Sequence, residues 1–512
     1  MNLTIFYNSF KSIFNNKNYI SLYLVFIVIL SLSMLNADNY SHLTNYILIL
    51  LLVSFLGIFC ILYYQKDKNK IHRAAFVIIV CFGVLTCFVT PILSVHDEGE
   101  HLIRAEITSR GELIPKYDPE TETYTTIKSI NNLFIDWDKK VVTSTYALLP
   151  IDYTPYHDPS AFAQNPFYGY LPQSLGIIIA KLLNLSTIWL LWLPRLFNLL
   201  FYAILSALAI RKSPILKVPL IVIACIPLTI YQSASVSIDS MVNGLGILII
   251  AYFFYMYKSS DKTIQMKEIF IFFFLCLLIG LCKVPYFALS LLILLIHPKK
   301  FKFKKYYYFN VIGILILGIL AILWTNSYAT PSMVNSWRKG FLIKNNINST
   351  EQISFIKNHF PEFLVSMLQI GNYIENLFSN KASFTGFFNF PLYGSLLVNT
   401  IYPLFLSSIC FLYPHKLTIN VKSRIGSFLT VYIIFVGTYI TLLLSWTPVG
   451  SINNIWMVQL RYFIPLIPLL PFTFGINNQI MKIERIDNIL IVLTIGFLAL
   501  LPVLTVIKTT MN

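Results

Sequence analysis

Long apolar runs, separated by shorter polar segments, follow one another along almost the whole chain. Many of them exceed the roughly 20 residues that a helix needs to cross a hydrocarbon core of about 30 Å. We therefore predict an all-α polytopic membrane protein with about 11–13 transmembrane helices. The predicted spans are residues 19–35, 44–64, 74–95, 188–210, 216–232, 239–257, 268–282, 285–297, 307–325, 393–413, 425–446, 459–476 and 487–507.

The loops between these spans alternate in charge, because lysine and arginine gather in every second loop. Cytoplasmic loops carry the excess of Lys and Arg, so the basic set is predicted to face the cytoplasm. Two long loops, at about 96–170 and about 326–390, then lie outside the cell, and residues 1–512 form a single membrane domain. The basic loop residues are Lys66, Lys68, Lys70, Arg73, Arg211, Lys212, Lys217, Lys258, Lys262, Lys267, Lys299, Lys300, Lys302, Lys304, Lys305, Lys416, Lys422, Arg424, Lys482 and Arg485.

Composition supports the same class. Charged residues make up 12% of the chain, against about 25% in soluble domains. The net charge of +16 lies in the short loops, so the positive-inside rule explains it better than a nucleic-acid partner does. The seven cysteines lie in or beside apolar runs without zinc-ligand spacing, and we expect them to pack between helices. No phosphate-binding loop of the ATPase type is present.

The most informative polar segment, residues 96–105, follows directly after the third predicted span. Acidic side chains at that depth are costly without a role or a partner. Asp97 would lie at the membrane boundary, where a carboxylate can take a proton from an acceptor hydroxyl as a general base. Two alternatives remain open: a solvated start of the loop, and a metal site built from His96, Glu98 and His101, whose spacing fits no standard ligand pattern.

Other charged residues fall at the outer ends of distant spans. Lys283 and Arg461 are exceptions to the rule that cations lie inside, and a cation at the outer boundary suits a lipid-linked phosphate. Arg195, at the outer start of its span, is a third candidate. Arg461 could instead be an interfacial anchor, and Asp239 could cap the next helix or face the outer cavity.

The segment at 96–105 also carries a resemblance to a known family. Asp97-Glu98, His101 and Arg104-Ala105 stand in the register of the Pro-Asp-Glu-x-x-His-x-x-Arg-Ala-like signature of DUF2142-type bacterial multi-span membrane proteins. Val95-His96 replaces the prolines of that signature. Further similar segments occur in the same order at 170–176, 195–198, 226–239, 283–286 and 461–468, and Val458-Gln459-Leu460 replaces the usual Gln-Gly before the last of them.

The resemblance implies membership of the GT-C glycosyltransferase superfamily. Such enzymes take a sugar from a polyprenyl-phosphate carrier and pass it to an extracytoplasmic acceptor. By this analogy we expect an inverting transfer to a cell-envelope glycan or wall polymer, in the plasma membrane, with no cofactor and no metal. Asp97 would be the base and Glu98 would adjust it electrostatically. Arg461, Lys283 and Arg195 would bind the carrier phosphate, and the expected supporting residues are His101, Arg104, Asp239 and Tyr462.

Two rival functions stay open at this point. A polysaccharide polymerase or ligase would use a polyprenyl-diphosphate donor and would depend on outer-loop arginines rather than on Asp97. A flippase or transporter of lipid-linked sugars would place charges near mid-span and use paired broken helices. The charges here lie at helix ends, which argues against a transporter. The segment 268–297, however, is predicted to be a hairpin of two short spans, so the transporter remains an alternative function.

Overall fold

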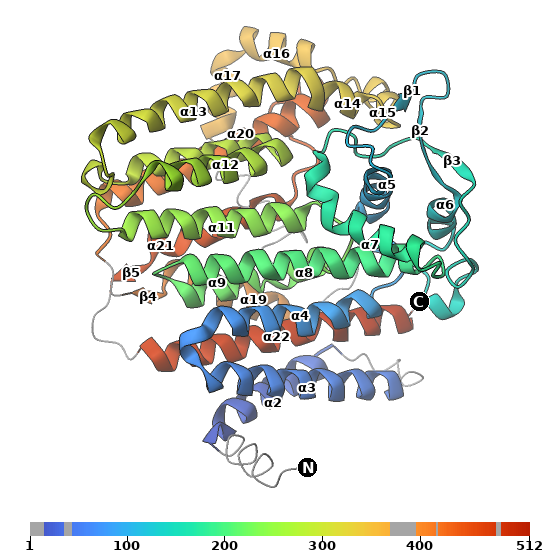
Figure 1. Ribbon diagram of the computed structural model, residues 1–512, viewed down its shortest axis with the longest axis horizontal. Helices are drawn as coiled ribbons and strands as arrows, with labels where there is room; N and C mark the ends of the chain where they lie inside the picture. The colour runs from blue at the N-terminus through green and yellow to red at the C-terminus, as the bar shows by residue number, and fades with distance from the viewer. Residues whose placement is uncertain (1–14, 35–42, 369–395, 416–417, 478–482, 512) are drawn as a thin grey trace.

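The computed structural model describes residues 15–34, 43–368, 396–415, 418–477 and 483–511. Its helices run side by side in a bundle (Figure 1). Within the described residues, seven helices are long and apolar enough to cross a membrane. They are α3 (Leu43–Lys66), α4 (Ile71–Val89), α8 (Trp189–Lys212), α11 (Asp239–Lys258), α13 (Lys304–Trp324), α20 (Val421–Trp446) and α22 (Ile483–Met511). The predicted all-α polytopic class is confirmed.

Shorter apolar helices pack among these seven: α2 (Lys17–Leu32), α12 (Met266–Cys282), η5 (Val284–Leu295), α19 (Leu396–Phe411), η9 (Leu460–Leu469) and α21 (Leu470–Phe474). The segment from α12 to η5 is a hairpin, because the Lys262 N–H donates to the Lys299 carbonyl at 2.9 Å and the Ile264 N–H to the Lys300 carbonyl at 3.0 Å. η5 is a 3₁₀ helix. Its rise of about 2.0 Å per residue makes it longer than an α-helix with the same number of residues.

The predicted spans 216–232 and 74–95 differ from the observed helices, and proline explains both of these differences. The predicted span 216–232 is two helices, α9 (Lys217–Ala224) and α10 (Pro227–Ser233). Pro227 has no N–H to continue the first helix, and it fits the first turn of the second. The predicted span 74–95 ends at Val89, because Pro91 disfavours a helical backbone at the residue before it. The polar segment after α4 is therefore longer than predicted.

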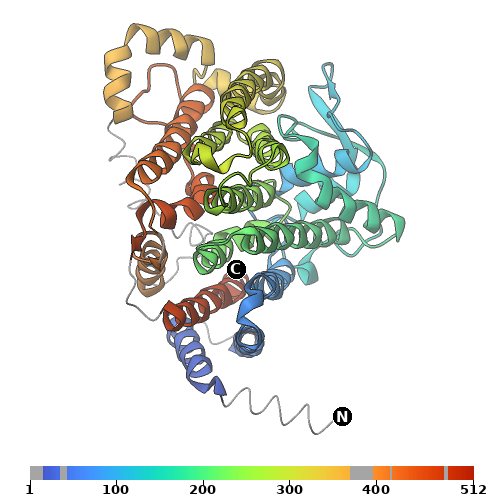
Figure 2. The same cartoon turned by 60° about the vertical axis from the view of Figure 1, so that its left-hand side comes forward.

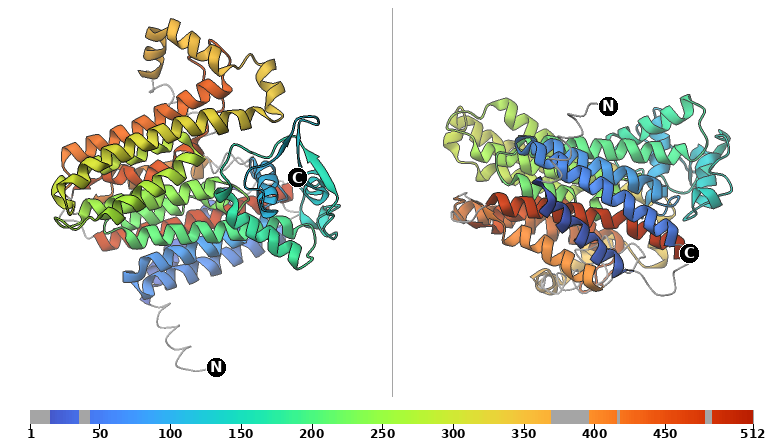
Figure 3. Two further views of the ribbon diagram at one scale, coloured as in Figure 1. Left: turned by 45° about the horizontal axis from the view of Figure 1, so that its top comes forward. Right: turned by 90° about the horizontal axis from the view of Figure 1, so that it is seen from below.

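The first long loop folds into a compact unit at one end of the bundle (Figures 1 and 3). It contains α5 (Glu98–Ser109), β1 (Tyr117–Asp118), β2 (Thr123–Ile127), α6 (Lys128–Ile135), η3 (Val141–Thr143), β3 (Pro155–Asp158) and η4 (Phe167–Tyr170), and it leads into α7 (Leu171–Leu182). The strands form an antiparallel sheet in the order β1-β2-β3, with Tyr124 opposite both Tyr117 and Asp158. This sheet was not predicted.

The second long loop contacts the first through the residues that follow α13. Its described part comprises η7 (Thr325–Ala329), α14 (Thr330–Val334), α15 (Arg338–Lys344), α16 (Ser349–Asn358) and α17 (Phe360–Leu368), while residues 369–395 lie outside the described chain. The Trp337 N–H donates to the Pro159 carbonyl at 3.2 Å, and the Tyr328 hydroxyl donates to the Ala163 carbonyl at 2.6 Å. α16 and α17 arch beyond the end of α20 (Figures 2 and 3). The two loops are thus joined at the same end of the bundle, and together they are called here the roof.

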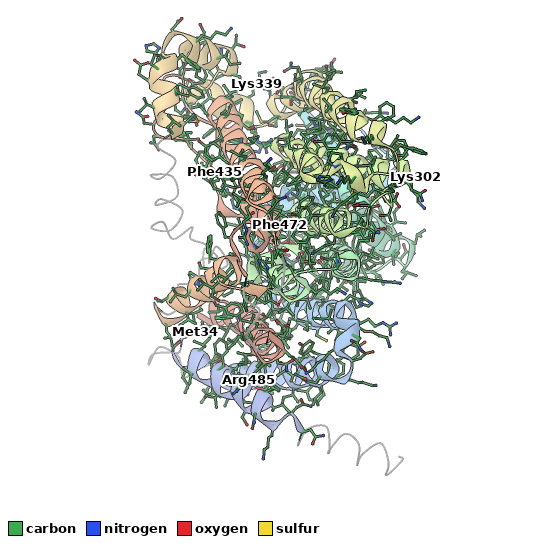
Figure 4. All side chains as sticks on the ribbon, turned by 90° about the vertical axis from the view of Figure 1, so that its left-hand side faces the viewer. Met34, Lys302, Lys339, Phe435, Phe472 and Arg485 are labelled. Carbon is green, nitrogen blue, oxygen red and sulfur yellow. The ribbon has the colours of Figure 1, made fainter. Side chains whose placement is uncertain are left out.

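The basic turns gather at the opposite end of the bundle. The turns joining α3 to α4, α8 to α9 and α11 to α12 all lie there in Figure 1, away from α5 and the sheet. Figure 4 looks onto this end, with Lys302 and Arg485 at different places on it. Phe472 lies near the centre of this view, and its ring stacks on Phe254 with a centroid distance of 5.3 Å. These turns and residues therefore lie on one side as the pattern of charges predicts, while Lys416 and Lys482 lie outside the described residues.

Candidate functional site

Asp97 occupies an unusual backbone position at the start of α5. Its φ is 63° and its ψ 4°, in the left-handed region that aspartate tolerates better than most residues. The side chain does not cap its own helix, and 31% of it is exposed. A backbone held in a sparsely populated region is common at functional sites, where surrounding structure compensates the cost. Here the turn directs the carboxylate toward other elements rather than toward the N–H groups of α5.

Four charged residues from four distant segments form a continuous chain of ion pairs, called here the ion-pair chain. Asp97 Oδ2 lies 2.6 Å from Arg461 Nη2, and Arg461 Nη1 lies 3.6 Å from Asp239 Oδ2. Asp239 Oδ1 in turn accepts a hydrogen bond from Lys283 Nζ at 2.6 Å. The residues come from the starts of α5, η9 and α11 and from the turn between α12 and η5. The fold thus brings together the four helix-end charges that the sequence singled out.

Neighbouring polar and aromatic groups fix the ion-pair chain in place. Gln232 Nε2 donates to Asp239 Oδ2 at 2.9 Å. The Lys283 ammonium lies 4.6 Å from the centre of the Tyr462 ring, and the Arg461 guanidinium lies 5.7 Å from the same ring. The Tyr462 carbonyl accepts a hydrogen bond from the Tyr286 hydroxyl. Tyr462 is therefore the aromatic surface on which both cations rest.

The electrostatics keep Asp97 ionised. Burial raises the pKa of its carboxyl, but the charge of Arg461 and the hydrogen bond that Arg461 donates outweigh that effect and bring the pKa below its usual range. His101 is different, because burial lowers its pKa to about 4 and leaves the ring neutral near pH 7. The exposed edge of the site therefore carries the Asp97 carboxylate, an anion that accepts hydrogen bonds. The neutral imidazole of His101 lies behind it.

Glu98 and Arg195 form a separate buried pair, and both side chains are 0% exposed. Arg195 Nε donates to Glu98 Oε1 at 2.8 Å and Nη2 donates to Glu98 Oε2 at 2.7 Å. The remaining N–H groups donate to the carbonyls of Cys87, Thr90 and Pro91 at 2.8–3.0 Å. Arg195 thus has no N–H left for a phosphate, so its predicted role as a phosphate ligand is wrong. Glu98 is a positioning residue that ties α5 to the end of α4.

His101 and Arg104 lie on the inner face of α5, in the wall of the first outer loop. His101 Nδ1 lies 2.7 Å from the Tyr170 hydroxyl, and Arg104 Nη2 donates to the Leu113 carbonyl at 2.8 Å. These contacts hold α5 against the rest of the loop. The metal site considered at His96, Glu98 and His101 does not form, since Glu98 is committed to Arg195. Among the described residues, no group of three potential ligands is arranged to hold a metal ion.

Sequence reasoning missed two further charged residues, Arg338 and Glu100. Arg338 begins α15 in the second outer loop, is 4% exposed, and carries two nitrogen atoms, Nε and Nη1, without a hydrogen-bond partner. Glu100 Oε2 is also buried without a partner. Burial raises the pKa of Glu100, while the charge of Arg338 works against that rise. An arginine beside tryptophan in an outer loop was the signal available, because it breaks the positive-inside pattern.

Comparison with known proteins places the chain in a family. A family model described as "Predicted membrane protein (DUF2142)" matches residues 80–470. The chain belongs to the DUF2142 family. The matched region of this DUF2142 protein begins within α4 and ends at the start of α21, so it contains the whole ion-pair chain, the Glu98–Arg195 pair and Arg338. No curated protein and no solved structure matches the chain.

Proposed function

We propose that this DUF2142 protein is an inverting membrane glycosyltransferase of the GT-C type. It moves a sugar from a polyprenyl-phosphate carrier to a glycan or wall polymer on the extracytoplasmic side of the plasma membrane. The observation that carries the proposal is Asp97, a partly exposed carboxylate held 2.6 Å from Arg461 at the roofed end of the bundle. The distribution of Lys and Arg supports the assignment of that end to the outer side.

The proposed chemistry is a single displacement at the anomeric carbon. Asp97 accepts the proton of the acceptor hydroxyl, and the acceptor oxygen forms the new bond to the anomeric carbon. The bond from that carbon to the carrier phosphate oxygen breaks, and the phosphate leaves with the electron pair. Attack from the face opposite the leaving group inverts the configuration. A carboxylate in this role contributes typically about 10²–10⁴-fold to a rate.

The cations of the ion-pair chain suit the leaving group. Negative charge grows on the carrier phosphate during transfer, and fixed positive groups in a site of low dielectric stabilise such charge most effectively. Arg461 retains an Nε without a partner in addition to the two N–H groups that face Asp97 and Asp239. We therefore assign the phosphate to Arg461 and Lys283, with Asp239 holding both cations in position.

The proposal is tested by analysing the polymer that receives the sugar. The sugar composition of cell-envelope polymers is compared between cells with wild-type protein, a deletion, Asp97→Asn and the control Glu120→Gln, which alters an exposed carboxylate of the same loop. The proposal expects one sugar to be missing from the deletion and from Asp97→Asn, with the variant still accumulating in the membrane. Unchanged polymers in Asp97→Asn beside altered polymers in the deletion would refute Asp97 as the base.

The hairpin of α12 and η5 is the observation that favours the rival transporter. Its turn carries Lys283, which lies in the ion-pair chain at one end of the bundle rather than at mid-span. A transporter of lipid-linked sugars would move its substrate across liposomes without changing any bond. Detection of such movement by the purified protein, with the glycosidic bond intact, would favour that function over glycosyl transfer.

A further inference from the structure

The ion-pair chain alone has no surplus positive charge to offer an anion. Its two carboxylates and two cations balance, and each cation already has an acidic partner within 2.6 Å. Apart from the Arg461 Nε, which has no hydrogen-bond partner, a phosphate entering this arrangement must compete with Asp97 and Asp239 for the nitrogen atoms of both cations. A site that binds a phosphate strongly therefore needs a further cation whose hydrogen-bond donors are not already used.

Arg338 has this property. Its side chain is 4% exposed, and its Nε and Nη1 have no hydrogen-bond partner. Buried polar atoms in proteins are nearly always paired, so two unpaired donors on one buried guanidinium point to a partner that binds there. Guanidinium is also the group best shaped for bidentate binding of phosphate oxygens.

Aromatic rings from three segments hold the Arg338 guanidinium. Its central carbon lies 4.7 Å from the ring centre of Phe162 in the first outer loop and 5.4 Å from that of Trp446 at the end of α20. The ring centre of the preceding residue, Trp337, lies 5.7 Å from the same carbon. Such rings bind a cation by its flat face and leave its edge, where the N–H groups are, available for hydrogen bonds. The edge is thus fixed in direction before any ligand arrives.

The charges that face Arg338 connect it to the site around Asp97. Burial lowers the pKa of Arg338, and the carboxyl groups of Glu100 and Asp97 are the neighbours that oppose this effect most strongly. Burial raises the pKa of the Glu100 carboxyl, while a hydrogen bond with Ser160 and the charge of Arg338 lower it. Phe162, which contacts the Arg338 guanidinium, also packs against His101 of α5 with a centroid distance of 4.8 Å, so a single ring separates Arg338 from the helix that begins directly after Asp97.

We propose that Arg338 is a phosphate ligand. It binds the phosphate of the lipid-linked donor from the second outer loop, while Arg461 and Lys283 of the ion-pair chain bind the same phosphate from the helix bundle. The proposal rests on the proposed function for the identity of the donor. Removing a hydrogen bond to a charged group costs an amount that corresponds to roughly a 10- to 100-fold loss of affinity. The second outer loop would thereby contribute a ligand that closes over the bound carrier.

The test measures binding of a long-chain polyprenyl phosphate, and of the uncharged polyprenol, to the full-length protein purified in detergent. Arg338→Gln should weaken binding of polyprenyl phosphate by about 10- to 100-fold, Arg338→Lys should restore part of it, and neither should change binding of polyprenol. The matched control is Lys339→Gln, the next residue, whose side chain is 52% exposed and pairs with Glu122. This control should bind both lipids like the wild type.

Each other outcome has a definite meaning. Equal binding of polyprenyl phosphate by Arg338→Gln and wild type overturns the role of Arg338 and leaves the proposed function intact. Loss of polyprenol and polyprenyl phosphate together shows a purely structural role for Arg338 and also overturns the inference. A wild-type protein that prefers neither lipid overturns both this inference and the proposed donor. Inorganic phosphate is tested in parallel, and Arg338-dependent binding of it without binding of the lipid assigns the site to a free anion.

Discussion

The buried pair of Glu98 and Arg195 permits a prediction that separates structure from substrate binding. Replacing Glu98 by glutamine leaves the Arg195 cation fully buried without an opposing charge. The side chain of Arg195 still reaches the carbonyls of Cys87, Thr90 and Pro91, but both bonds to a carboxylate are lost or weakened. Breaking a buried ion pair at one partner costs about 3–5 kcal/mol.

The double variant supplies the internal check. Glu98→Leu with Arg195→Met removes both charges at similar volume, a change that is often neutral when the groups pack well. Here the three carbonyls lose their donors, at about 1–3 kcal/mol for each that stays dry. We therefore expect the double variant to be less stable than wild type but more stable than the summed effects of Glu98→Leu and Arg195→Met measured singly, with a coupling energy of about 0.5–3 kcal/mol.

Thermal unfolding of the purified protein in detergent measures these effects, with binding of polyprenyl phosphate measured on the same samples below the unfolding temperature. Glu98→Gln and Arg195→Gln should both lower the unfolding temperature by several degrees while folded protein still binds the lipid. If Arg195→Gln unfolds at the wild-type temperature and loses only lipid binding, Arg195 is a phosphate ligand after all and the assignment made from its hydrogen bonds is refuted.

Two further predictions concern the first outer loop and the helix packing beneath it. Burial raises the pKa of Asp158 from 3.8 to about 7, so the folded state binds more protons than the unfolded state between these values and stability falls as pH rises through them. Asp158→Asn should therefore raise the free energy of unfolding at pH 8 by an amount on the order of 2–4 kcal/mol, seen as a higher unfolding temperature, and should raise it much less at pH 5. Equal gains at both pH values would contradict the assignment. Gly176→Ala should lower the free energy of unfolding by about 1–3 kcal/mol, because the added Cβ would lie 2.6 Å from the Pro194 backbone nitrogen. An unchanged unfolding temperature would show that α7 and α8 can separate freely.

Much of the fold follows from the sequence, because length and apolarity decide which segments cross a membrane. The hairpin around Lys283 and the gathering of basic turns at one end agree with the pattern of charges along the chain. The sheet of the first outer loop was not predicted, since β2 is five residues long and pairs with a strand almost 30 residues further along the chain. Short strands that depend on a distant partner leave little local signal.

The site shows a similar division. The membrane orientation predicted from the basic loops puts four charged residues at the same end of the bundle: Asp97, Asp239, Lys283 and Arg461. The structure brings them within ion-pair distance. Position along a helix axis does not reveal which neighbour a side chain faces, so Arg195 was assigned to a phosphate although it faces the carbonyls at the end of α4.

Arg338 shows the other limit of the sequence. It lies in a loop whose packing against Phe162 and Trp446 only the tertiary structure reveals. No hydrophobic period or motif in the loop marks this arginine as buried, since its aromatic neighbours come from other segments of the chain.

The most direct measurement of the central claim is the mass of the lipid-linked sugars that accumulate in cells carrying Asp97→Asn. Glycosyl transfer by this protein predicts a polyprenyl monophosphate bearing one sugar, raised in Asp97→Asn and in the deletion, together with loss of a residue of the same sugar from an envelope polymer. Accumulation of a polyprenyl diphosphate would support the polymerase or ligase instead. A wild-type pool of lipid-linked sugars in Asp97→Asn, with unchanged polymers, would contradict the account.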